Sequence, residues 1–64
     1  MNARFINIIK VKGQIIDLFL SGYHHEELGS KRALAEQVTG HYYPESDIEI
    51  VSLHTQNLAY IEKE

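Results

Sequence analysis

The sequence predicts a small α+β domain in the order β-hairpin, helix, β-hairpin (ββαββ), with one antiparallel sheet and one main helix. Three observations favour this fold: β-branched and aromatic residues are frequent in both end regions, Gly13 divides the first apolar region in two, and good helix formers lie between the end regions. A chain of 64 residues has the length of one domain, so residues 1–64 are expected to fold as a single unit.

The first hairpin is predicted over residues 4–20. Lys12 and Gly13 suit a two-residue turn, because such turns demand positive φ and glycine tolerates it. The register set by this turn places Asn7, a polar residue, on a face that is otherwise apolar. Residues 14–20 also have apolar side chains at helical spacings, so strand and helix are both open for this segment. Three pairs are expected on that face: Phe5 opposite Leu20, Asn7 opposite Leu18, and Ile9 opposite Ile16.

The helix is predicted over Lys31–Thr39. Ser30 can cap its first turn, and Gly40 suits the position after its last residue because glycine adopts the left-handed conformation found there. Most residues of the segment are good helix formers. One side of the predicted helix is apolar and carries Leu34, Ala35, Val38 and, by extension, Tyr42.

The second hairpin is predicted after Tyr43-Pro44, because the residue before a proline is restricted to extended conformations. A strand from Ile48 to Leu53 is expected to turn near Gln56-Asn57 and to return over residues 58–61. Gln-Asn is not a favoured dipeptide for a tight turn, so this hairpin has a weaker local signal than the first.

Both faces of the predicted sheet are largely apolar, and one helix can cover only one of them. The helix side is expected to carry Phe5, Ile9, Val11, Ile16, Leu18, Leu20, Ile48, Ile50, Ala59 and Ile61. The opposite face is expected to carry Ile6, Ile8, Ile15, Phe19, Val51, Leu53 and Tyr60. Burial of one large apolar side chain contributes about 1.5–3 kcal/mol, so we predict that this second set is an interface in a homodimer. The alternatives are scattered surface aliphatics, or a bulge near Val51 that changes the phase of the last strands.

Composition argues against several classes of protein. The chain has no cysteine, so neither disulfides nor thiolate metal sites can stiffen the domain. Nine acidic and six basic residues give a net charge of −3, which disfavours non-specific binding to nucleic acid. No apolar run approaches the roughly 18–20 residues of a membrane span, and the first residues do not resemble a signal peptide. We therefore expect a cytoplasmic protein, with Met1 and the polar last residues marking a complete gene product.

The densest group of potential ligands is the succession His24, His25, Glu26 and Glu27. Imidazole and carboxylate groups bind metals and exchange protons. Adjacent histidines in an extended segment point in opposite directions, however, and no His-x-x-x-His or His-Glu-x-x-His spacing occurs. No serine or threonine has the flanking residues of a catalytic nucleophile. We expect no metal, no cofactor and no enzymatic activity, while metal binding by these four residues is left undecided.

A second candidate surface combines tyrosines with basic residues. Lys31 and Arg32 begin the predicted helix and Tyr42 and Tyr43 follow it, so these four are expected to form an edge that binds a protein partner. The sequence thus predicts a small non-enzymatic interaction module, a homodimer that binds or inhibits another protein. The alternative is a small nucleic-acid-binding regulator with a basic and aromatic surface. That surface would consist of Lys10, Lys12, Lys31, Arg32, Tyr42 and Tyr43.

Overall fold

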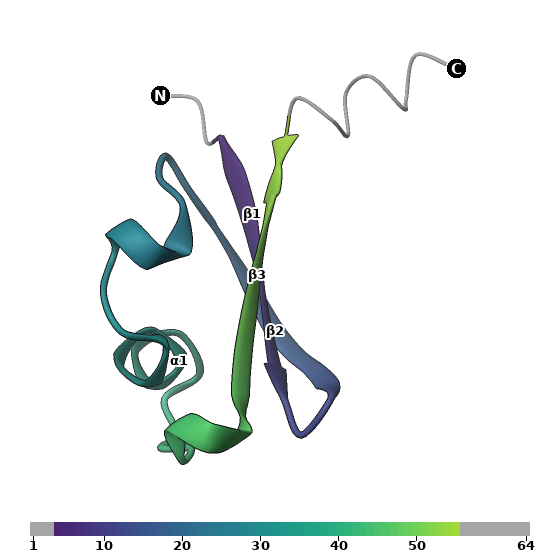
Figure 1. The fold of residues 1–64 in the computed structure, drawn as a ribbon, viewed down its shortest axis with the longest axis vertical. Helices are drawn as coiled ribbons and strands as arrows, with labels where there is room; N and C mark the ends of the chain where they lie inside the picture. The colour runs from purple at the N-terminus through teal and green to yellow at the C-terminus, as the bar shows by residue number, and fades with distance from the viewer. Residues whose placement is uncertain (1–3, 56–64) are drawn as a thin grey trace.

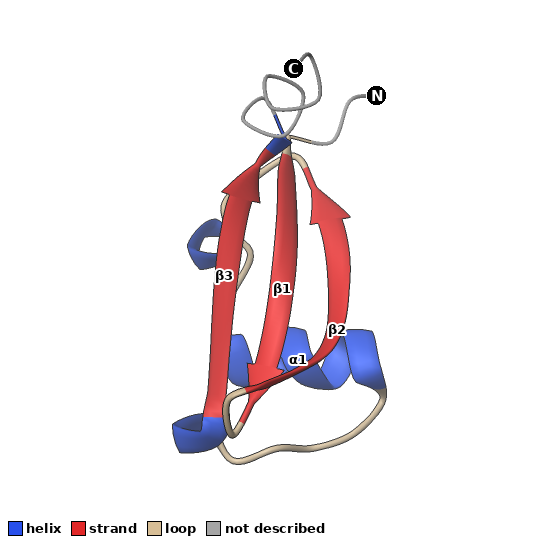
Figure 2. Cartoon of the chain, turned by 90° about the vertical axis from the view of Figure 1, so that its right-hand side faces the viewer, coloured by secondary structure: helices blue, strands red, loops and turns tan. Residues whose placement is uncertain are grey.

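A central strand, β1, pairs with one strand on each side to form an antiparallel sheet in the order β2-β1-β3 (Figure 2). The computed structural model describes residues 4–55 of the chain. The predicted α+β class, with one antiparallel sheet and one main helix, is confirmed. The elements in chain order are β1 (Phe5–Val11), β2 (Gln14–Ser21), the 3₁₀ turn η1 (His25–Glu27), α1 (Lys31–Thr39), the 3₁₀ turn η2 (Glu45–Asp47) and β3 (Ile48–His54).

The predicted order of the elements is only partly matched. The first hairpin and the helix lie where they were expected, and residues 14–20 belong to a strand rather than a helix. Over residues 4–55 a single strand follows α1, so the order there is ββαβ and not ββαββ. The returning strand predicted over residues 58–61 lies outside the described residues, and so do Ala59, Tyr60 and Ile61.

Lys12 and Gly13 form the tight turn between β1 and β2, with φ values of 52° and 81°. Both values are positive, as a type I′ turn requires. The Lys12 N–H donates a hydrogen bond to the Asp47 carbonyl oxygen (2.9 Å), which attaches the turn to the start of β3. The predicted turn is therefore confirmed.

The predicted register of β2 is wrong at all three of the expected pairs. Lys10 pairs with Ile15 as the turn requires, but Ile9 pairs with Asp17, which leaves Ile16 as an additional residue in a β-bulge. A bulge of one residue moves every later side chain of the strand to the other face. Phe19 therefore lies on the helix side and packs against the core, on the face opposite the other predicted interface residues of β1 and β3. Three residues predicted for the core are instead exposed: Ile16, Leu18 and Leu20.

The apolar core lies between α1 and the end of the sheet that carries the Lys12-Gly13 turn (Figure 1). It is small, because only five apolar side chains are buried among the described residues. The predicted apolar side of α1 is confirmed for its first three members. The buried residues are Ile9, Leu34, Ala35, Ile48 and Ile50, with Val11, Phe19, Val38 and Tyr43 packed against them.

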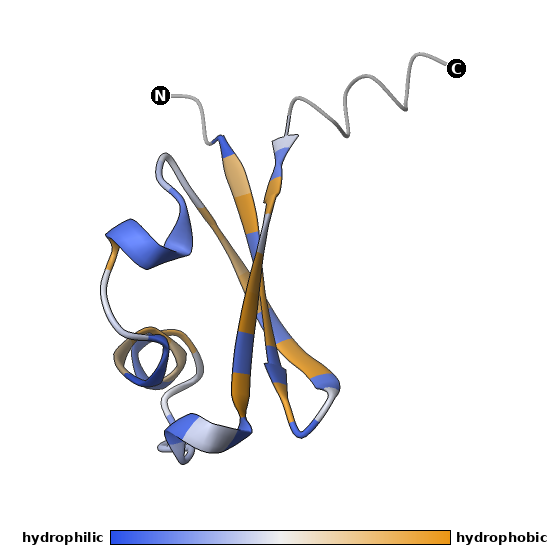
Figure 3. Cartoon of the chain, viewed as in Figure 1, coloured by the Kyte–Doolittle hydropathy of each residue, from blue (hydrophilic) through white to orange (hydrophobic). Residues whose placement is uncertain are grey.

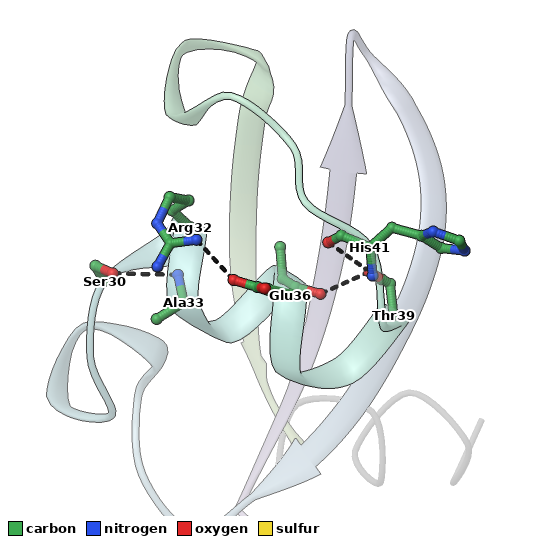
Figure 4. Close-up of polar contacts among 7 residues, drawn as sticks. Ser30, Arg32, Ala33, Glu36, Thr39 and His41 are labelled. Atoms are coloured by element: carbon green, nitrogen blue, oxygen red, sulfur yellow. Dashed lines mark hydrogen bonds and ion pairs between the residues drawn. The ribbon is translucent and has the colours of Figure 1, made fainter.

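Both ends of α1 are capped as predicted (Figure 4). At the first turn the Ser30 Oγ accepts a hydrogen bond from the Ala33 N–H (3.2 Å). At the last turn Gly40 has a φ of 80° and its N–H donates to the Glu36 carbonyl oxygen (2.8 Å). These local signals explain why the bounds of the helix follow directly from the sequence.

Asn7, in the middle of β1, is fully buried on the helix side, next to η1. Its Nδ2 donates to the Phe19 carbonyl oxygen (3.2 Å) and to the Ser21 Oγ (2.8 Å). Its Oδ1 accepts a hydrogen bond from the Ser52 hydroxyl (2.6 Å). The Ser52 Oγ in turn accepts from the His25 N–H (3.1 Å). One amide thus connects all three strands, and through Ser52 it also holds η1 against the sheet.

Asn7→Leu is expected to lower the free energy of unfolding by about 2 kcal/mol, because the Ser52 hydroxyl loses its buried acceptor and the Ser21 Oγ loses its buried amide donor. The change keeps the branched shape and the number of heavy atoms of the side chain and raises its hydrophobicity, so that the loss of hydrogen bonds is the main unfavourable effect. Chemical denaturation at one fixed protein concentration provides the measurement, with the exposed Gln14→Leu as the control. A more stable Asn7→Leu variant would show that the amide network contributes nothing.

Candidate functional site

Among residues 4–55, no helix covers the side of the sheet opposite α1, and Figure 2 looks directly onto this side, with α1 and η1 behind the strands. The register places two apolar rows of three residues across this face. We call these six residues the open-face patch. One row consists of Leu20, Ile6 and Leu53, and the other consists of Leu18, Ile8 and Val51.

The patch is accessible to solvent, and its most exposed members lie on the outer strands. Leu20 is 59% exposed, Leu18 is 52% exposed and Leu53 is 41% exposed, whereas Ile6 and Ile8 on the central strand are half-buried. Figure 3 shows apolar residues along all three strands rather than on one. A contiguous apolar surface of this kind is typical of an association site.

The structure brings together most of the predicted interface residues. Ile6, Ile8, Val51 and Leu53 belong to the patch, and Ile15 borders it with 62% of its surface exposed. Sequence reasoning missed Leu18 and Leu20, because it placed no bulge in β2. Alternation alone does not indicate a bulge, but the predicted pairing of a polar residue, Asn7, with Leu18 was the available signal.

A row that contains two charges ends the patch on the side of the Lys12-Gly13 turn. Lys10 occupies the centre of this row on β1, Glu49 flanks it on β3 and Ile15 flanks it on β2. The patch therefore has a charged margin at one end. This margin limits how another surface can lie on the sheet, because burial of an unpaired charge is costly.

The outer edge of β2 is protected against pairing with another strand. Asp17 is the one charged residue of β2, and it points to the helix side, where it pairs with Ile9. Its Oδ1 accepts a hydrogen bond from the Leu18 N–H (2.8 Å), so that this backbone donor of the edge strand is already bound. Inward-pointing charges and bulges are both devices that discourage edge-to-edge association. The exposed apolar side chains of β2 can thus pack against another surface on the open face, whereas Asp17 and the bulge disfavour pairing of another strand with the edge of β2.

Comparison of the chain with protein-family models, with curated proteins and with solved structures finds no match. Within the part of the chain that the structure describes, no helix has the length and apolar character needed to cross a membrane. The function must therefore be argued from the geometry of the chain itself.

The predicted partner-binding edge is divided by the structure. Tyr42 is 64% exposed, and the Arg32 guanidinium carbon lies 5.4 Å from the centre of its ring, in a cation–π contact. Arg32 also forms an ion pair with Glu36 (2.7 Å). Tyr43, by contrast, packs against the core, and Lys31 is half-buried. Arg32 and Tyr42 are the pair that the fold presents together.

The basic residues of the nucleic-acid alternative lie on different sides of the sheet. Lys10 lies on the open face, whereas Lys31 and Arg32 belong to α1 on the other face. Lys12 is held at the turn beside Asp47, an acidic residue. No geometric observation therefore gathers these cations into one surface.

A pocket of about 540 Å³ lies at the end of the sheet that carries η1. Its aromatic wall includes Phe5, whose ring contacts His24 and His54 edge-on at centroid distances of 5.8 and 5.0 Å. Within residues 4–55, no three histidine or acidic side chains are grouped closely enough to hold a metal ion. The lining residues are Arg4, Phe5, Gly22, Tyr23, Glu27 and His54.

The two adjacent histidines near this pocket have distinct roles. The His24 Nδ1 accepts a hydrogen bond from the Glu26 N–H (3.2 Å) and so caps η1. The rings of His24 and His25 lie 4.5 Å apart. Partial burial, together with the neighbouring His24, lowers the pKa of His25 below its ordinary value of 6.5, and Glu26 acts in the opposite direction. His25 in the folded chain therefore resists protonation.

Asp17→Val is expected to convert the dispersed protein into aggregates or fibrils, because it leaves Ile15–Leu20 as an uninterrupted apolar edge. Asp17→Lys retains a charge at the edge and is expected to stay dispersed. Thioflavin T fluorescence and the pelleted fraction after centrifugation measure the difference. If Asp17→Val stayed as dispersed as the parent chain, the inference that Asp17 prevents association through the β2 edge would be wrong.

Stability is expected to decrease as the pH falls through about 6.5, because the unfolded chain binds the His25 proton more tightly than the folded chain does. The loss continues down to the lowered pKa of folded His25. His25→Gln removes the imidazole and keeps the backbone N–H that bonds Ser52, so its free energy of unfolding should depend less on pH over this window. Equal pH dependence of the two proteins, measured by urea denaturation, would contradict the assignment.

Proposed function

We propose that this protein is a small non-enzymatic interaction module that dimerises through the open-face patch and binds or inhibits another protein. The observation that carries the proposal is the pair of apolar rows that no other described residue of the chain covers, on one side of a sheet whose core is small. Domains of this size bury too little surface to be robust alone, and association is a common remedy. A second copy that covers the rows would supply the burial that a single helix does not.

Two features support a face-on association. The exposed leucines project from the sheet face, and the β2 edge is guarded by Asp17 and the bulge. Packing of two sheets face to face buries alternate side chains of every strand at once. The patch supplies such side chains from all three strands.

The binding of a protein partner is assigned to the pair Arg32 and Tyr42. Arginine and tyrosine are among the residue types enriched at binding hot spots. Both belong to the α1 side of the molecule, so this edge stays accessible when the open face is covered. A dimer would carry two copies of the edge and could bind a divalent partner with increased avidity.

Leu18→Glu is expected to weaken the dimer by at least about 10-fold, because each copy loses apolar burial and gains a desolvated charge. Leu28→Glu is the matched control, since Leu28 is 37% exposed in the segment between η1 and α1, away from the patch. Sedimentation at several micromolar concentrations gives the mass of each protein. A parent chain that is monomeric throughout, or equal effects of the two variants, would refute dimerisation through the patch. Phe19→Glu is not a suitable probe, because Phe19 packs against the core.

The salt dependence of nucleic-acid binding distinguishes the alternative function, a nucleic-acid-binding regulator, from a protein-binding module. Binding of duplex DNA or RNA at low salt that falls steeply as salt rises would favour a nucleic-acid regulator over a protein-binding module. No binding at low salt would remove that alternative. The variant Tyr42→Ala is informative in either assay, because Tyr42 is a member of both predicted surfaces.

A further inference from the structure

The open-face patch is nearly symmetric about a line that crosses the strands between its two rows. Each row has a leucine on β2 and an isoleucine on β1, and β3 contributes Leu53 to one row and Val51 to the other. Exchange of the two rows thus replaces each side chain by one of the same class. A surface of this kind can pack against a second copy of itself in an isologous, two-fold contact.

Two orientations of the two-fold axis allow the sheets to pack face to face, and they differ in which side chains meet. An axis parallel to the strands brings β2 of one copy against β3 of the other and sets β1 against β1. Leu20 then faces Leu53 of the second copy, and Lys10 faces Lys10. An axis across the strands exchanges the two rows, so that Leu20 faces Leu18 and Ile6 faces Ile8 of the second copy.

The charged margin distinguishes the two orientations. With the axis parallel to the strands, two Lys10 ammonium groups oppose each other on the central strands, and Glu49 faces the apolar Ile15. Opposed like charges and an unpaired buried carboxylate are both unfavourable. With the axis across the strands, the margins of the two copies lie at opposite ends of the contact. Each Lys10 then lies opposite Arg4 of the second copy, which precedes Ile6 by two residues on the same face, and Glu49 in the same row supplies an opposite charge beside the two cations.

We propose that the partner of the open-face patch is a second copy of this chain, docked about a two-fold axis that runs across the strands between the Ile6 and Ile8 rows. The proposal rests on the dimer of the proposed function and adds its geometry. All six apolar residues of each copy are covered, and the row of Lys10, Glu49 and Ile15 forms the rim. The guarded β2 edge remains outside the contact.

Mixing of charge variants tests the orientation. L20E and L18K are each expected to dimerise at least 10-fold more weakly than the parent chain. In a 1:1 mixture the carboxylate of L20E meets the ammonium of L18K, while the unchanged leucines of the two chains meet each other. The mixed dimer should therefore be at least 10-fold tighter than either variant alone. Native mass spectrometry counts the mixed species, and sedimentation at several concentrations measures its dissociation constant.

The matched control replaces L18K by L53K. With the axis across the strands, a mixture of L20E and L53K should not dimerise more tightly than either variant alone. With the axis parallel to the strands, this mixture alone should recover a tight dimer. All three positions are exposed in the single chain, and circular dichroism checks that each variant keeps the parent fold.

Recovery with L53K and not with L18K would overturn the proposed axis, and recovery with neither would overturn this docking altogether. In both of these cases a dimeric parent chain leaves the proposed function standing. A monomeric parent chain refutes both.

Discussion

The hydrogen bonds of one buried amide determine how the strands of this sheet are aligned. Asn7 needs partners for both its donor and its acceptor atoms, because an unsatisfied polar group in the interior costs more than the lost bond itself. Those partners are Ser21 on β2 and Ser52 on β3. Without the bulge, Asn7 would face Leu18, and Ser21 would point to the other side of the sheet. The bulge at Ile16 is therefore required for the hydrogen bond between Asn7 and Ser21.

The same register accounts for the composition of the open face. Once Phe19 and Ser21 lie on the helix side, Leu18 and Leu20 must lie on the other, since successive side chains of a strand alternate. The helix side is then divided between an apolar core beside α1 and a polar cluster beside η1. Leu18 and Leu20, which would lie in the core if β2 had no bulge, are therefore exposed on the open face. The proposed association through that surface would make the free energy of unfolding depend on protein concentration.

The parts of the fold that follow from the sequence are those with local causes. The turn at Lys12-Gly13 and the caps at Ser30 and Gly40 each depend on residues within one turn of chain. The register of β2 does not, because the bonds that justify it join residues 14 and 45 positions apart. Tyr42 and Tyr43 were separated by tertiary packing in the same way: periodicity extended the apolar side of the helix to Tyr42, whereas the chain after Gly40 delivers Tyr43 to the core.

Because of the bulge at Ile16, the number of residues in β2 determines which of its side chains lie on the open face and which lie on the helix side. Loss of one codon from this part of the gene would change no other residue, yet it would send the two leucines inward and bring the phenylalanine and the serine outward. Most point mutations alter a surface one side chain at a time. Here an in-frame deletion of three nucleotides would exchange two surfaces, so both faces of the sheet depend on the number of residues in β2 as well as on their identity.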